Sequence, residues 1–138
     1  MNTEPIDGFD TVGDDPFPDY VPVWDANKLS AEFTRTSTAL LEAVSELRIA
    51  ETAHEAAKDV YEDAAASCLA GPTPPDGKNA EIREAQLKER LSSELKAVRL
   101  ASRAVGDAKS NLRLAEIGWD NARCQCRCAE LAAREIER

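Results

Sequence analysis

Residues 33–68 read FTRTSTALLEAVSELRIAETAHEAAKDVYEDAAASC, and the spacing of their side chains decides the fold. One row recurs every seven residues, at Phe33, Leu40, Leu47, His54, Tyr61 and Cys68. A second row follows three positions later, at Thr36, Ala43, Ala50, Ala57 and Ala64. Side chains at alternating intervals of three and four lie on one face of an α-helix. The stretch therefore predicts a long helix with one narrow face for packing.

The same spacing returns in the C-terminal half of the chain. One row is Leu91, Val98, Val105, Leu112, Trp119, Cys126 and Ala133, and its companion is Ala101, Ala108, Ala115, Ala122, Ala129 and Ile136, interrupted only by Glu94. All seven prolines lie outside residues 28–70 and 79–138, so neither stretch is broken by proline. The sequence predicts an all-α fold, a long antiparallel helical hairpin packed as an alanine-rich coiled coil. We expect a helix at 28–70, a turn at 71–79, a helix at 80–138 and an extended N-terminal arm at 1–27.

Helix length and hairpin geometry predict how the two helices face each other. At about 1.5 Å per residue they would measure roughly 65 Å and 90 Å, so the second helix should extend past the start of the first. Counting outward from the turn places Phe33 near Trp119. Gly106 and Gly118 each cost a helix about 1 kcal/mol relative to alanine, so we expect a close neighbour at both positions.

The N-terminal arm is acidic and aromatic. Residues 1–27 contain seven acidic residues and no lysine or arginine, and prolines separate Phe17, Tyr20 and Trp24. A solvated tail is one interpretation, because charge and proline oppose folding. We favour docking, because aromatic residues anchor binding segments. The surface on which the arm docks is either the arginine-rich far half of the second helix or another chain.

The second helix carries more apolar side chains than one partner helix can cover. Ile117, Cys124 and Leu131, together with Leu100, Leu114 and Cys128, form an additional row. The arm, another copy of the chain or a different protein could cover it. We therefore expect Phe17, Tyr20, Trp24, Trp119 and Leu131 to bind partners.

The sequence Cys-Gln-Cys-Arg-Cys at residues 124–128 is the most unusual local feature. A helix directs Cys126 about 200° away from Cys124, so one copy cannot gather the three thiolates round a metal ion, and we expect no metal site. One interpretation makes Cys126 a small core residue. The other, of similar weight, is an intermolecular disulfide through Cys124 or Cys128, with Cys126 staying reduced.

Composition limits the classes of function. The chain has 138 residues and a net charge of −9, which opposes direct nucleic-acid binding, and no apolar run is long enough to span a membrane. Residues 1–20 have neither the positive nor the apolar region of an export signal. The single histidine, His54, lies in a predicted packing row, and no cofactor motif is present. We expect no cofactor and no enzymatic activity.

The function that fits these features is a structural or interaction protein. We expect an accessory or linking component of a larger assembly, such as a bacteriophage particle, that binds other proteins or further copies of itself in the virion. The alternative is a small acidic regulator or inhibitor, an anti-defence or polymerase-binding protein, that acts in the cytoplasm on a basic protein surface.

Overall fold

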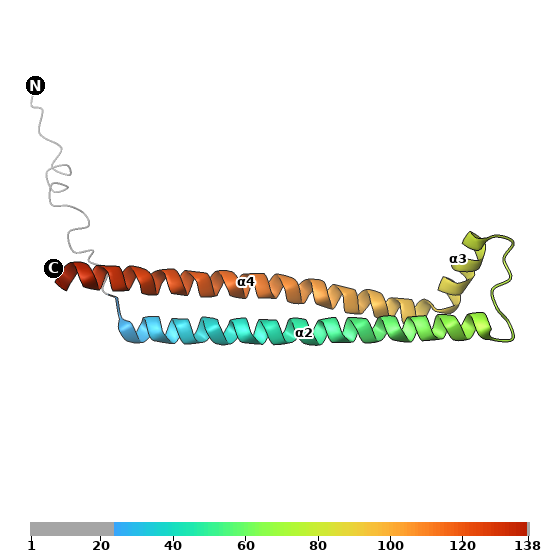
Figure 1. Ribbon diagram of the computed structural model, residues 1–138, viewed down its shortest axis with the longest axis horizontal. Coiled ribbons are helices and arrows are strands. Elements are labelled where there is room, and N and C mark those ends of the chain that lie inside the picture. The colour runs from blue at the N-terminus through green and yellow to red at the C-terminus, as the bar shows by residue number, and fades with distance from the viewer. Residues whose placement is uncertain (1–23, 138) are drawn as a thin grey trace, which may run out of the picture.

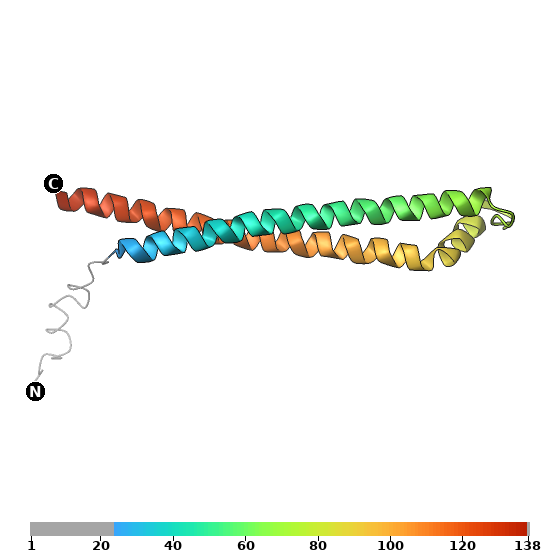
Figure 2. The same cartoon turned by 90° about the horizontal axis from the view of Figure 1, so that it is seen from below.

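The computed structural model describes residues 24–137, which form three helices and no strand. Helix α2 comprises Ala26–Ala70, α3 comprises Ala80–Arg90 and α4 comprises Ser92–Glu137. The all-α prediction is confirmed. The two long helices α2 and α4 lie side by side and run in opposite directions (Figure 1). The C-terminal end of α4 extends past the start of α2, as predicted (Figures 1 and 2). The reason differs from the predicted one: α2 and α4 have 45 and 46 residues, and the overhang arises because α4 begins part-way along α2. Among the described residues no helix is long and apolar enough to cross a membrane.

Side chains that cap the backbone set the ends of the helices. The carboxylate of Asp25 accepts hydrogen bonds from the backbone N–H groups of Asn27 and Lys28, at 2.9 and 3.3 Å, so α2 begins two residues before the predicted boundary. The side chain of Asn79 accepts a hydrogen bond from the Ile82 N–H at 2.8 Å and starts α3. Gly71 follows the last residue of α2, and Pro72 prevents the helix from continuing.

The contact between α2 and α4 follows the two predicted rows. The buried residues are mostly small, namely Thr36, Ala43, Val105, Ala108 and Ala122. The hydroxyl of Thr36 donates to the backbone carbonyls of Glu32 and Phe33, so its burial leaves no unpaired donor. Ala133 and Ile136 were predicted to pack in these rows, and they are exposed because they lie where α4 extends past α2.

One helix was expected over residues 80–138, and that expectation is wrong at Leu91. This residue, with φ −103° and ψ 28°, separates α3 from α4, and α3 is set at an angle to α4 (Figure 1). The loop after α2 holds α3 in this direction: the Gly77 N–H donates to the Gln86 side chain at 3.1 Å, and Arg90 donates to the Thr73 carbonyl. These contacts hold α3 against the loop, so residues 80–90 do not extend α4 in a straight line along α2.

The two glycines of α4 do not have the close neighbours that we expected. A Cβ atom on Gly106 would meet nothing within 4 Å, and one on Gly118 would lie 3.9 Å from the Thr36 methyl group, an ordinary contact. The crowded glycine is Gly77 in the loop, where a Cβ atom would lie 2.5 Å from Ile82 Cγ2. Close packing therefore explains why residue 77 is a glycine, and it does not explain the glycines at positions 106 and 118.

Candidate functional site: two apolar surfaces on α4

The first apolar surface is a groove at the open end of the helix pair, where α2 begins and α4 ends. It has a volume of about 890 Å³ and is lined mainly by Trp24, Leu29, Phe33, Cys126, Ala133 and Ile136. We call it the open-end groove. Ile136 is 80% exposed, because α2 does not reach that far along α4. The groove therefore lies between the first turns of α2 and the last turns of α4, and its outer part runs past the start of α2.

An aromatic contact closes the inner end of the open-end groove. The rings of Phe33 and Trp119 lie 6.5 Å apart between centroids and are tilted by 43°, within the range of favourable aromatic pairs. The guanidinium carbon of Arg123 lies 4.6 Å from the Trp119 ring centroid, a cation–π contact. Arg123 also lies 3.7 Å from the Asp120 carboxylate. The contact joins α2 to α4 beside the groove, and the inner face of α4 stays covered as far as Ala122.

Charged side chains border the groove on both sides. Near the start of α2, a hydrogen bond from Arg35 holds the pKa of Glu32 below its ordinary value, and Glu32 raises the pKa of Arg35 in return. Arg35 is exposed and Glu32 is half-buried, and an ion pair this accessible to solvent keeps the rim charged and contributes little to stability. On α4, Arg127 and Glu130 line a neighbouring hollow beside Phe33. An apolar floor with a charged rim is typical of a protein-binding surface.

The second apolar surface is a row on the side of α4 away from α2. We call it the outer row, and it consists of Leu114, Ile117, Asn121, Cys124, Cys128 and Leu131. All six side chains are exposed, and Leu114, Ile117 and Leu131 are 68%, 52% and 50% exposed. The spacing between them alternates between three and four residues, so they form one continuous stripe along the helix. The described residues of the chain do not cover this stripe.

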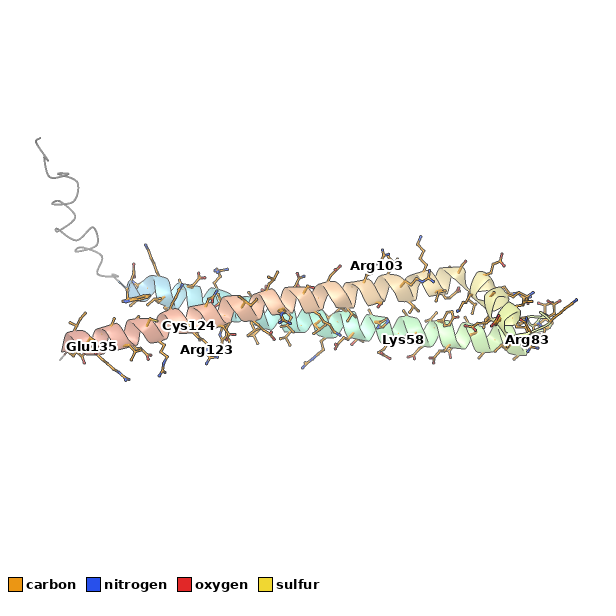
Figure 3. All side chains as sticks on the ribbon, turned by 90° about the horizontal axis from the view of Figure 1, so that it is seen from above. Lys58, Arg83, Arg103, Arg123, Cys124 and Glu135 are labelled. Atoms are coloured by element: carbon orange, nitrogen blue, oxygen red, sulfur yellow. The ribbon has the colours of Figure 1, made fainter. Side chains whose placement is uncertain are left out.

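The three cysteines of residues 124–128 divide between the two surfaces. Cys126 is half-buried in the open-end groove, whereas Cys124 and Cys128 are exposed on the outer row, and all are free thiols in this single chain. Figure 3 labels Cys124 next to Arg123 on this part of α4. Within residues 24–137 no three His, Cys, Asp or Glu side chains are placed to hold a metal ion together. The intermolecular disulfide stays a prediction.

The partner-binding residues predicted from the sequence do not form one site. Trp24 lines the open-end groove and Trp119 lies half-buried at its inner end, whereas Leu131 belongs to the outer row. Phe17 and Tyr20 lie outside the described residues.

Sequence reasoning missed Leu29, and it assigned Arg123 to the arginine-rich half of the second helix without predicting its contact with Trp119. Leu29 lies seven residues before Thr36 and so continues the packing row of α2, and Arg123 lies one helical turn after Trp119. Both spacings can be recognised in the sequence and would have predicted these positions.

No family model, curated protein or solved structure matches this chain. Its function is therefore inferred from the two apolar surfaces on α4.

Proposed function

We propose that this chain is a non-enzymatic structural or interaction protein, a helical hairpin packed as an alanine-rich coiled coil that links other proteins within a larger assembly such as a bacteriophage particle. The long antiparallel pair of α2 and α4 supports this role, because it separates the loop end from the open end by most of the length of the molecule (Figure 1). A rod of this kind holds two sets of partners at a fixed spacing.

The open-end groove is the observation that carries the proposal. Trp24, Phe33 and Ile136 give it a large apolar lining, and the lining is only partly covered within the chain. An exposed apolar surface with a polar border is one of the features that mark a protein-binding site. The partner we infer is a protein segment that offers aromatic or aliphatic side chains to the groove.

The experiment is affinity isolation of the full chain from its native source, with a groove variant and a matched control. Ile136→Glu places a charge in the groove, and Leu41→Glu places the same charge on a 71% exposed leucine of α2 that does not line the groove. Wild-type and Leu41→Glu chains should retain the same partner at the same ratio. Ile136→Glu should lose most of it while keeping its helix content.

Two results would count against the proposal. If Ile136→Glu and Leu41→Glu retain the partner equally, the groove is not the binding site. If the partner is a single basic protein that dissociates as salt is raised and binds both variants, the acidic regulator is the better account.

A further inference from the structure

The outer row gives α4 a second seam in addition to the one that packs against α2. The inner seam includes Leu112, Ala115, Trp119, Ala122 and Cys126, all buried or half-buried. The outer row repeats the same spacing on the other side of the helix, and its six side chains are exposed. A stripe with this period packs most readily against a second stripe of the same period. A second copy of the chain supplies one.

We propose that two copies of the chain associate through their outer rows, with the two α4 helices parallel and in register. The inference rests on the proposed function, because it specifies one of the partners as the chain itself. The paired segment runs from Leu114 to Leu131 and is about 25 Å long at 1.5 Å per residue. Each α2 helix then lies on the outside of its own α4.

Asn121 determines the direction of the pair. A polar residue at one core position of a coiled coil selects the alignment in which it meets its own copy. In the parallel alignment the amide of Asn121 can donate to, and accept from, the amide of Asn121 in the other copy. The antiparallel alignment that best matches the leucines pairs Leu114 with Leu131 and leaves Asn121 against the weakly hydrogen-bonding thiol of Cys124.

The charges beside the outer row lie on one flank. That flank carries Arg113, Asp120, Arg127 and Arg134, and the other flank is uncharged, with Asn111, Gly118, Gln125 and Ala132. In a parallel pair each charged flank lies beside the uncharged flank of the other copy, with Asp120 next to an amide donor, Gln125. In the antiparallel pair the charged flanks meet, and repulsion between Arg113 and Arg134 is offset by attraction between Asp120 and Arg127. The charges therefore permit both alignments, and Asn121 selects the parallel one.

The parallel alignment also predicts how the exposed thiols are placed. Cys124 and Cys128 each face their own copy across the seam, and a disulfide needs Cα atoms within about 7 Å. The short apolar contact places the interface at the small end of specific interfaces, so association should depend on concentration. Oxidation of either pair would make the dimer covalent.

The first experiment is sedimentation velocity of the full chain over a concentration series, with reductant and about 150 mM salt present to screen the net negative charge. We expect a monomer–dimer equilibrium for wild type and for the control Leu41→Glu. Ile117→Glu should weaken dimerisation by 10-fold or more without loss of helix content in circular dichroism. A wild-type chain that stays monomeric up to 200 µM, or equal weakening by both variants, would overturn the proposal.

The second experiment tests direction with a chain that keeps one cysteine, the triple variant Cys68→Ser, Cys124→Ser and Cys126→Ser, because the antiparallel alignment separates the two Cys128 residues by about 16 Å along the axis. Oxidised glutathione accepts the two electrons: one sulfur–sulfur bond forms between the two Cys128 residues, the glutathione disulfide breaks, and two glutathione thiols carry away the protons. We expect a covalent dimer that is lost when Ile117→Glu is added. A reversible dimer that does not cross-link contradicts the parallel alignment. A wild-type chain that stays monomeric while it still binds its partner at the groove would refute this inference and leave the proposed function standing.

Discussion

The ring of Phe33 on α2 lies 6.5 Å from the ring of Trp119 on α4, between centroids, and Phe33 also lines the open-end groove. Close packing continues for about one turn of α4 beyond this contact, because Ala122 is 3% exposed. Farther along, α4 extends past the start of α2, and Ile136 is 80% exposed. The same aromatic pair therefore contributes to the contact between the helices and to the wall of the groove.

Removing either ring should destabilise the helix pair. Phe33→Ala and Trp119→Ala should each lower the free energy of unfolding by about 1–3 kcal/mol, less than for a fully buried ring because Phe33 is 39% exposed. In a double-mutant cycle the two changes should be coupled by about 0.5–1.5 kcal/mol. Chemical denaturation of the four proteins gives the coupling, and a value near zero would show that the rings do not stabilise one another.

The most buried alanine of the helix pair should not tolerate a larger side chain. Ala122 is 3% exposed, so Ala122→Leu should lower the free energy of unfolding by about 1–3 kcal/mol through overpacking. Ala104 is exposed on the same helix, and Ala104→Leu is the matched control, with an expected change within about 0.5 kcal/mol. Thermal unfolding measures both. Equal stability of the two variants would contradict close packing at Ala122.

Gly106 should be replaceable with a gain in stability. A Cβ atom there meets nothing within 4 Å, so Gly106→Ala should raise the free energy of unfolding by about 1 kcal/mol. Gly77→Ala should act in the opposite direction, because its Cβ atom would lie 2.5 Å from Ile82 Cγ2. Thermal denaturation of both variants shows whether the free energy of unfolding rises for Gly106→Ala and falls for Gly77→Ala. Destabilisation by Gly106→Ala would mean that Gly106 has a neighbour that this chain alone does not supply.

Removal of residues 1–23 should separate folding from binding. Asp25 caps α2 and is retained, so the helix content of the remaining residues should not change. Binding of assembly partners should weaken, because Phe17 and Tyr20 are removed. Circular dichroism and affinity isolation give the two quantities. Unchanged partner binding by the shortened chain would exclude the arm from the interaction.

The heptad spacing was sufficient to predict which faces of α2 and α4 meet, because alanine and large residues alternate with one period over most of both helices. It did not predict the break at Leu91, since that break arises from loop contacts made by Gln86 and Arg90, which no periodicity records. The open-end groove was only partly visible in the sequence. Ile136 fits the packing row by spacing, and it is exposed because α4 begins part-way along α2 and therefore ends beyond the start of α2.

The most direct test of the central claim is the stoichiometry of this chain in assemblies purified from its native source. Isotope-labelled peptides from residues 24–137 would quantify it by mass spectrometry against the major component of each fraction of a density gradient. The account predicts that the chain follows one assembly at a constant ratio through the gradient. A chain that sediments only at its own mass, or as its own dimer with no other protein, would contradict it.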